Sequence, residues 1–272
     1  MKKLLSGALA LALCASLTGC GGSGDGEDKT LTIGASVTPH AEILNNIKPD
    51  LEEMGYTVEI VEFSDYVKPN TALEDGELDA NYFQHNQYLA EWNETNGTDL
   101  VSAGDIHFEP MGIYSDKVTS LDELEDGQHL TISIPNDPTN GGRALQLLAA
   151  NGIITLEEDL GISATPNDIT DSPYDVDIIE MAAETIPVNL SEVDLAISNG
   201  NNALNANVLD QLLVTEDADG VAQQFANCIA VRSGDEDSQK IQDLMSVLKS
   251  QKTIDFINEN YNGVVVPFFT VE

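Results

Sequence analysis

The sequence predicts an α/β protein with two lobes, each built on a largely parallel sheet. Stretches with strand-like and helix-like hydrophobic patterns alternate from Leu31 to the end of the chain, which is typical of strands joined by helices. The alternation starts again at Leu130, after a largely extended stretch over Leu100–Tyr114. Polar clusters follow strands in both halves of the chain, and parallel sheets bind ligands at the carboxyl ends of their strands. We therefore expect a ligand site between the two lobes.

The first 19 residues predict a signal peptide. Lys2 and Lys3 precede an apolar stretch, Leu4–Leu17, that is too short to span a bilayer. The run LTGC at 17–20 resembles the lipobox of bacterial lipoproteins, which implies cleavage before Cys20, lipid attachment to its sulfur and anchorage on the extracytoplasmic face of the cell membrane. Residues 20–30 are rich in Gly, Ser and charge and predict a flexible tether. An ordinary secretory signal, with Cys20 incidental, is the alternative.

Charge and cysteine content narrow the possible partners. The formal charge is -36, from 47 acidic and 11 basic residues, and loss of Lys2 and Lys3 would make it -38 by subtraction. Such a field repels nucleic acid and anionic membrane surfaces. Of the three cysteines, Cys14 lies in the signal and Cys20 would be lipidated, so Cys228 has no partner for an intrachain disulfide.

The hydrophobic pattern assigns the elements of each half. In the first half we expect strands at Leu31–Ser36, Thr57–Phe63 and Leu78–Phe83, and helices at His40–Met54, Pro69–Gly76 and Asn86–Thr95. Pro49 predicts a kink in its helix, and Thr57–Phe63 is apolar enough to be partly buried on both faces. In the second half a second series of alternating strands and helices begins at Leu130–Ile134 and continues through Gly142–Asn151, Val176–Glu180, Leu190–Val193 and Leu195–Ser198. We then expect an extended stretch at Cys228–Arg232 and helices at Asp235–Gln251 and Ile254–Tyr261.

Arg143 is the strongest single candidate for ligand binding. It is one of two arginines in the chain and lies in IPNDPTNGGRALQLL (Ile134–Leu148), where a strand, a polar loop and the start of a helix follow one another. Free backbone N–H groups and a guanidinium placed together suit a small anion, most naturally a carboxylate. The alternative is a surface arginine paired with one of the many acidic residues, which would contribute little.

Two further groups of side chains follow strand ends. The aromatic group comprises Tyr66, Tyr82, Phe83 and His85. The amide group comprises Asn140, Asn199 and Asn227. Aromatic walls accept a thioether or another soft aliphatic group, and amide oxygens accept hydrogen bonds from an ammonium. With Arg143 these groups predict a site for an amino acid with an apolar tail, although core packing is the alternative for the aromatic residues.

Four segments resemble those of a known family. They are VEFSDYVKPNTALEDGELDANYFQHNQYL (Val61–Leu89), IHFEPMGIYS (Ile106–Ser115), SIPNDPTNGGRAL (Ser133–Leu145) and VVVPFF (Val264–Phe269). The family is that of the methionine-binding lipoproteins of bacterial ABC importers, and the resemblance runs from about Leu31 to Phe269. It implies a two-lobe periplasmic-binding-protein type II fold with the ligand in the cleft between the lobes. The implied lobes are residues 31–114 plus 230–272 and residues 115–229, with crossings near Tyr114 and Asn227–Ile229.

The resemblance also implies function and residue roles. A monomeric, lipid-anchored protein without cofactor would capture L-methionine, or else D-methionine or a methionine-containing dipeptide, and deliver it to the membrane and ATPase subunits of an importer. Arg143 and Asn140 would bind the ligand carboxylate, and Asn199 and Asn227 its ammonium. The side-chain pocket would be lined by Tyr66, Phe83 and His85, with Tyr82 close by. Asn202 and Cys228 depart from the family pattern, which puts the tail preference in doubt.

Three other functions compete with ligand capture for import. A metal-binding lipoprotein would need ligand spacing that His40, His85, His107 and His129 do not show, and we expect three of these four to be surface or loop residues and no metal site. A hydrolase would need a Gly-x-Ser-x-Gly or His-Glu-x-x-His motif, and the sequence has neither. Cys228 lies in an apolar strand, where burial would leave it unreactive. An adhesin is the third alternative, and the sequence does not separate it from an importer component.

Overall fold

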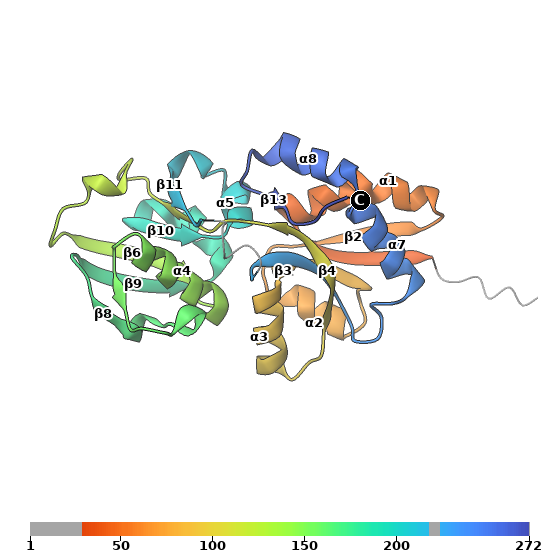
Figure 1. Cartoon of the computed structure of the whole chain (residues 1–272), viewed down its shortest axis with the longest axis horizontal. Coiled ribbons are helices and arrows are strands. Elements are labelled where there is room, and N and C mark those ends of the chain that lie inside the picture. Colours follow the sequence, from red (N-terminus) through yellow and green to blue (C-terminus); the bar gives the residue numbers. More distant parts are fainter. Residues whose placement is uncertain (1–28, 218–223, 272) are drawn as a thin grey trace, which may run out of the picture.

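The computed structural model describes residues 29–217 and 224–271, and these residues form two lobes side by side (Figure 1). The predicted signal peptide, Cys20 and most of the tether lie outside the described residues. The first lobe is built on a sheet of order β13-β4-β12-β3-β1-β2 and the second on a sheet of order β11-β5-β10-β6-β9. Each sheet has its own buried apolar cluster, so the two-lobe prediction agrees with the packing.

The first lobe contains both ends of the described chain. Its strands are β1 (Thr30–Ser36), β2 (Thr57–Phe63), β3 (Ala80–His85), β4 (Val101–Phe108), β12 (Ala226–Val231) and β13 (Val266–Pro267). Its helices are η1 (Val37–Ala41), α1 (Glu42–Glu53), α2 (Lys68–Glu74), α3 (Asn86–Asn96), α7 (Gln239–Leu248) and α8 (Gln251–Tyr261). Leu44, Ile47 and Leu51 on α1 are fully buried against this sheet, and α1 is one continuous helix through Pro49, so it does not restart there.

The second lobe is continuous in sequence. Its strands are β5 (Gly112–Tyr114), β6 (His129–Pro135), β9 (Asp175–Met181), β10 (Leu195–Ser198), β11 (Leu212–Thr215) and the separate pair β7 (Thr155–Leu156) and β8 (Ile169–Asp171). Its helices are α4 (Pro138–Ala150) and α5 (Gly200–Ala206), with short 3-10 turns at Leu121–Glu123, Gly161–Ser163, Pro166–Asp168, Ala183–Thr185, Pro187–Glu192 and Leu209–Gln211.

Both sheets are mixed, which corrects the prediction of largely parallel sheets. Strand β1 is parallel to β2 and β3, and β6 is parallel to β9 and β10. Strand β12 is antiparallel to β3 and β4, and β5 is antiparallel to β10 and β11. The reason is topological: β5 and β12 are the first strands after each passage between lobes, so they enter their sheets from the side where the lobes meet.

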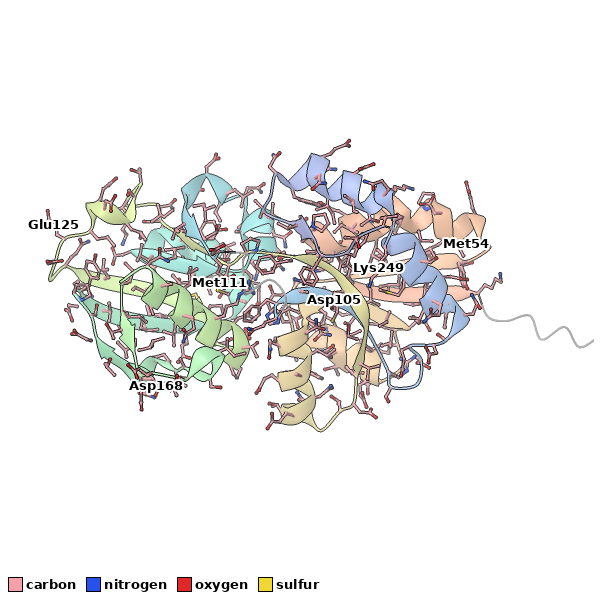
Figure 2. All side chains as sticks on the ribbon, in the orientation of Figure 1. Met54, Asp105, Met111, Glu125, Asp168 and Lys249 are labelled. Carbon is pink, nitrogen blue, oxygen red and sulfur yellow. The ribbon has the colours of Figure 1, made fainter. Side chains whose placement is uncertain are left out.

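Strand β4 of the first sheet ends at Phe108 and β5 of the second begins at Gly112, and β11 of the second sheet ends at Thr215 and β12 of the first begins at Ala226, so the chain passes between the lobes after β4 and again before β12. Met111, labelled near the middle of Figure 2, lies on the first crossing and is fully buried. The lobe boundaries near Tyr114 and Asn227–Ile229, which the resemblance implies, stay a prediction and lie within a few residues of these segments. Tyr114 pairs within the second sheet, and Asn227–Ile229 pairs within the first.

Three other expectations are wrong. Strand β2 is the edge of its sheet, and Val58 is its one buried residue, because apolar character alone does not reveal a strand's place in the order. Leu190–Val193 lies mostly in a 3-10 turn rather than a strand. Helix α4 begins at Pro138, four residues before the expected start, since proline suits the first helical turn as well as it suits a loop.

Candidate functional site

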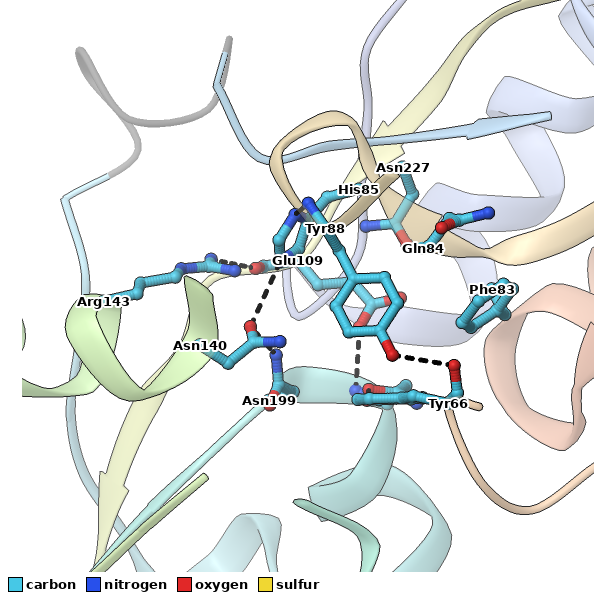
Figure 3. A pocket seen from close by; sticks show the side chains of 11 residues that line it. Tyr66, Phe83, Gln84, His85, Tyr88, Glu109, Asn140, Arg143, Asn199 and Asn227 are labelled. Atoms are coloured by element: carbon cyan, nitrogen blue, oxygen red, sulfur yellow. Dashed lines mark hydrogen bonds between the residues drawn. The ribbon is translucent and has the colours of Figure 1, made fainter. Parts of the chain in front are cut away.

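A pocket lies where the two lobes meet, and Figure 3 shows side chains from both lobes converging on it. Eleven residues line it: Tyr66, Phe83, Gln84, His85, Tyr88, Glu109, Asn140, Arg143, Asn199, Asn201 and Asn227. The first lobe contributes the end of β3, α3, the loop after β2 and the start of β12. The second contributes the start of α4 and the loop after β10, and Glu109 comes from the first crossing. The predicted location between lobes thus agrees with the structure.

Hydrogen bonds between side chains join the two lobes across this pocket. Asn140 Oδ1 accepts from His85 Nε2 at 3.1 Å and from Asn199 Nδ2 at 2.8 Å. His85 caps α3, because its Nδ1 accepts the backbone N–H of Tyr88 at 3.0 Å, and this leaves Nε2 as the donor to Asn140. Burial, aided by the charge of Arg143, lowers the pKa of His85 to about 3. His85 is therefore a neutral, oriented part of the wall.

Aromatic rings form the other side of the pocket. The ring centroids of Tyr66 and Phe83 lie 6.0 Å apart, and those of Phe83 and Tyr88 lie 5.9 Å apart. The Tyr66 hydroxyl donates to Asn201 Oδ1 at 2.7 Å and accepts from Asn202 Nδ2 at 2.9 Å. Asn202, which departs from the family pattern, therefore supports the ring of Tyr66 from the opposite lobe. This wall offers the flat apolar surface that the sequence predicted.

Arg143 is buried, which excludes the surface-pair interpretation. Its guanidinium donates from Nε and Nη2 to the two carboxylate oxygens of Glu216 at 2.8 and 2.6 Å, and from Nη2 to the Glu109 carbonyl at 2.8 Å. Its side chain is 3% exposed and that of Glu216 8%, and the guanidinium carbon lies 4.1 Å from the ring centre of Phe225. Arg143 is thus fixed on both crossings while it lines the pocket.

Helix α4 places Asn140 and Arg143 because of its local sequence. Asp137 caps the helix by accepting the Asn140 N–H at 3.0 Å, and Pro138 occupies the first turn. Gly142 lets the helix approach residues 161–163, since a Cβ there would lie 1.9 Å from the Ile162 carbonyl oxygen. The residues that predicted a loop instead start a helix, and its first two turns carry both candidate side chains.

Glu109 is the acidic residue of the pocket, and the sequence interpretation missed it. Its Oε1 accepts from His107 Nε2 at 2.7 Å, and its Oε2 accepts from the Asn201 backbone N–H at 2.8 Å. Burial by itself raises the pKa of Glu109, but these hydrogen bonds and the nearby histidines outweigh it, so the pKa lies below its ordinary value. Glu109 therefore carries its negative charge at neutral pH. A single acidic residue between the apolar strands of IHFEPMGIY was the available signal.

Tyr82 does not line the pocket, which corrects its assignment as a neighbour of the ligand. It is fully buried in the core of the first lobe, where its hydroxyl contacts His107 Nδ1 and its ring packs on His40. Alternation along β3 explains this, since adjacent residues point to opposite faces of a sheet. Phe83 and His85 face the pocket while Tyr82 faces the core. Gln84, Tyr88 and Asn201 line the pocket as well and were not singled out.

The histidines are more buried than we expected. His40, His85 and His107 are buried, and His129 alone among the four is exposed. His40, His107 and Glu109 bring one ligand atom each to within 4.8 Å of one another, which is a donor set that could hold a metal. Burial lowers the pKa of His40 to about 4, and His40 Nε2 lies 3.0 Å from Asn227 Oδ1. Hydrogen bonds within the protein therefore already use several of these atoms.

Cys228 is buried on β12, as its apolar surroundings predicted. Its sulfur lies 3.7 Å from the Gln84 carbonyl oxygen, and burial raises its pKa to about 12. A thiol with such a pKa is a poor nucleophile at neutral pH. Among the residues that the structure describes, no helix combines the length and the apolar character needed to cross a membrane.

The fold and the pocket define a two-lobed substrate-binding protein with its site between the lobes. Residues 31–269 match the model of the family described as NlpA lipoprotein. The chain belongs to the NlpA lipoprotein family, and this confirms the resemblance found in the sequence. The family is one of membrane-anchored extracytoplasmic lipoproteins rather than enzymes.

Relatives and solved structures agree with this assignment. The methionine-binding lipoprotein MetQ of Bacillus subtilis is 40% identical over 98% of this chain and 99% of its own length. A lipoprotein structure from Ruminococcus gnavus is 47% identical, with a TM-score of 0.85 over 88% of this chain and 99% of its own. A nutrient-binding protein from Burkholderia cenocepacia, bound to methionine, is 37% identical with a TM-score of 0.82 over 88% of this chain and 100% of its own. The predicted periplasmic-binding-protein fold is thereby confirmed.

Proposed function

We propose that this protein captures methionine outside the cell membrane and delivers it to an ABC importer. The observation that carries the proposal is the pocket between the lobes, which combines a buried guanidinium, a buried carboxylate, buried amide groups and an aromatic wall. These are complementary to the carboxylate, the ammonium and the apolar tail of an amino acid. The names of the Bacillus relative and the Burkholderia structure support methionine as that amino acid.

We assign the residue roles from the hydrogen-bond donors and apolar surfaces that contacts within the protein leave unused. Arg143 uses Nε and Nη2 in its contacts with Glu216 and the Glu109 carbonyl, so its Nη1 amine is the group that would donate to a ligand carboxylate, with the Asn140 amide beside it. Phe83, Tyr66 and His85 would enclose the thioether, which packs well against aromatic rings. Tyr82 would not contact the ligand and would only support β3 by packing in the core of the first lobe.

Isothermal titration calorimetry with a panel of ligands tests the substrate. The detergent-solubilised lipoprotein should release heat with L-methionine and much less with leucine or glutamate. D-methionine and a methionine-containing dipeptide belong in the same panel, because they carry the same thioether and differ at the charged groups. Arg232→Ala is a control for the loss of an arginine outside the pocket, and it should bind L-methionine as the wild type does. Arg232 donates hydrogen bonds to the carbonyls of Leu73 and Leu78, and neither residue lines the pocket. Binding of another class of amino acid instead of methionine would refute the proposal.

We also propose that Cys20 carries the lipid anchor and that the protein is a monomer. Cys20→Ser should move the protein from the membrane fraction to the soluble fraction. Cys14→Ser, in the apolar segment Leu4–Leu17 that precedes Cys20, should leave the protein in the membrane fraction. Retention of the Cys20→Ser variant by membranes would argue against lipidation at this residue, and sedimentation velocity of that variant would report a dimer if one forms.

Metal capture is a second candidate function, and the cluster of His40, His107 and Glu109 is the observation that favours it. Neutral imidazoles and a carboxylate are suitable zinc ligands. Protein purified without chelator and then dialysed should contain less than one metal ion per ten chains if methionine capture is the function. Stoichiometric zinc that is lost in His107→Gln would favour metal capture instead.

A further inference from the structure

The charges that face the pocket do not cancel. Arg143 is neutralised within the protein, because Glu216 binds two of its nitrogens at 2.8 and 2.6 Å and both side chains are buried. Glu216 does not line the pocket and lies behind the guanidinium, where its Oε2 also accepts the Met111 N–H at 2.8 Å. It therefore holds Arg143 permanently rather than occupying the place of a ligand carboxylate.

Glu109 has no such partner. Among the described residues, its carboxylate has no ion pair with a lysine or arginine side chain, and its hydrogen-bond donors are His107 Nε2 and the Asn201 N–H. The Nε2 atom of the other nearby histidine, His40, lies 3.6 Å from Glu109 Oε1 and 3.0 Å from Asn227 Oδ1. A carboxylate has about four acceptor positions, so Glu109 retains capacity for a donor from the pocket. Figure 3 shows its side chain in the middle of the lining residues.

A second group points to the same kind of donor. Asn199 Oδ1 is buried and has no hydrogen-bond partner among the described residues, while its Nδ2 is engaged by Asn140. A buried acceptor without a donor destabilises the protein, so a ligand that donates a hydrogen bond to Asn199 Oδ1 gains affinity. Asn227 is less suited to this role, because its Oδ1 already lies 3.0 Å from His40 Nε2.

We infer that Glu109 is the ionic partner of the ligand's ammonium group, with Asn199 Oδ1 as its second acceptor, and that the ammonium contributes more to affinity than the carboxylate does. This inference rests on the proposed function and names a residue that the family resemblance did not supply. An ammonium at Glu109 meets a buried carboxylate that no lysine or arginine of the described residues pairs, whereas a carboxylate at Arg143 meets a guanidinium that Glu216 has already neutralised.

Three ligands separate these contributions in calorimetry at pH 7. L-methionine carries both charges, L-methioninamide keeps the ammonium, and N-acetyl-L-methionine keeps the carboxylate. For the wild-type lipoprotein we expect L-methioninamide to bind within about tenfold of L-methionine and N-acetyl-L-methionine to bind at least about a hundredfold more weakly. The opposite order, with N-acetyl-L-methionine bound more tightly than L-methioninamide, would overturn the inference.

Glu109→Gln tests the residue itself, because it removes the charge and keeps the size and one acceptor oxygen. We expect it to weaken L-methionine by about a hundredfold and to remove most of the discrimination between L-methionine and N-acetyl-L-methionine. That ratio is measured within one variant, so a general loss of stability cancels from it. Glu77→Gln is the matched control, since Glu77 is exposed outside the pocket and carries the same charge change. Glu109→Asp should bind L-methionine with intermediate affinity.

The outcomes distinguish this inference from the proposed function. Failure of the wild type to bind methionine would refute the proposed function and this inference with it. Binding by the wild type together with unchanged affinity in Glu109→Gln would overturn this inference alone. Affinity that disappears after treatment of the wild type with EDTA would also overturn it, because Glu109 would then act as a metal ligand.

Discussion

At the scale of single residues, Arg143 shows how one cation is used in a very acidic chain. Seven lysine and arginine side chains form ion pairs in the described residues: Lys48, Lys68, Lys117, Arg143, Arg232, Lys240 and Lys252. The pair of Arg143 with Glu216 is the most buried of these, and the others are at least partly exposed. Because both charges of this pair are removed from water, loss of either partner leaves a buried unpaired charge and lowers the stability of the protein. Loss of one partner of an exposed pair has little effect.

Arg143→Ala should therefore lower the affinity for methionine by about 2–4 kcal/mol, mainly because the negative charge of Glu216 is then unpaired and repels the ligand carboxylate. It should also lower the free energy of unfolding by about 3–5 kcal/mol, since Glu216 is left buried and unpaired. Calorimetry and urea unfolding measure the two effects. In Arg143→Ala/Glu216→Gln both the stability and the affinity should recover in part, because the unpaired charge of Glu216 is removed. Wild-type affinity in Arg143→Ala would remove Arg143 from the ligand site.

His85 makes stability depend on pH. Its pKa is about 3 in the folded protein and about 6.5 in the unfolded chain, so below pH 6.5 the unfolded chain binds the proton first. Its contribution to stability is full above pH 6.5 and is lost progressively as the pH falls towards 3. Between pH 7.5 and pH 5 the loss from His85 is about 2 kcal/mol.

His85→Asn should remove this loss, since asparagine does not titrate and can still cap α3. The difference in unfolding free energy between wild type and His85→Asn, measured in urea, should shrink by about 2 kcal/mol from pH 7.5 to pH 5. His40 titrates in both proteins and cancels from the comparison. An unchanged difference would mean that His85 is not held neutral by burial.

The sequence predicted the site residue by residue where the chemistry of a single side chain was distinctive. Arg143 stood out as one of two arginines, and Tyr66, Phe83, His85, Asn140, Asn199 and Asn227 do line the pocket. Tyr82 could not be separated from Phe83, because the pattern does not show which face of β3 meets the pocket. Glu109 could not be separated from the other acidic residues, because only packing reveals which carboxylate is buried.

At the scale of elements, α4 depends on a close approach to the turn at Gly161–Ser163. Gly142→Ala adds a Cβ that would lie 1.9 Å from the Ile162 carbonyl oxygen. Alanine favours a helix by about 1 kcal/mol over glycine, but displacement of a backbone costs more. We expect a net loss of about 1–3 kcal/mol of stability in urea unfolding. Because Asn140 and Arg143 lie on α4, methionine affinity should fall too, and a stabilised variant would refute the predicted clash.

Element type was predictable from hydrophobic period, whereas boundaries and positions in the sheets were not. Strands β1, β6 and β10 and helices α1 and α3 agree closely with their predicted ranges. The start of α4 was missed because Pro138 and the glycines fit a loop and a first helical turn equally well. The edge position of β2 follows from pairing between distant segments, which leaves little trace in a local pattern.

At the scale of the whole molecule, the two-lobe arrangement was predictable because the alternation of strands and helices restarts near Leu130. The direction of β5 and β12 was not, since it is set by how the chain passes between lobes rather than by local sequence. Each lobe closes its own apolar core. The contacts between lobes at the pocket are, by contrast, mostly polar.

The acidic surface should make stability depend on salt. Figure 2 shows side chains tipped with oxygen projecting from both lobes, and the net charge is -36. Counterions screen this repulsion over about 10 Å at 0.1 M salt. The melting temperature at pH 7 should therefore rise by a few degrees between about 0.01 M and 0.5 M NaCl. The rise should be much smaller near the pI of about 4.1, and an equal rise at both pH values would exclude charge repulsion as its cause.

The hydrogen bonds that join the two lobes at the pocket have a consequence for turnover during transport. The partners of Tyr66 and His85 on the opposite lobe are amides, and water replaces each such bond at a net cost of about 1 kcal/mol. Separation of the lobes removes the contact of Leu204 on α5 with the apolar cluster of the first lobe but leaves both clusters otherwise intact, so it costs far less than unfolding. A carrier must release its cargo as readily as it takes it up, and an interface made of exchangeable polar contacts lets the importer pull the lobes apart without unfolding either of them.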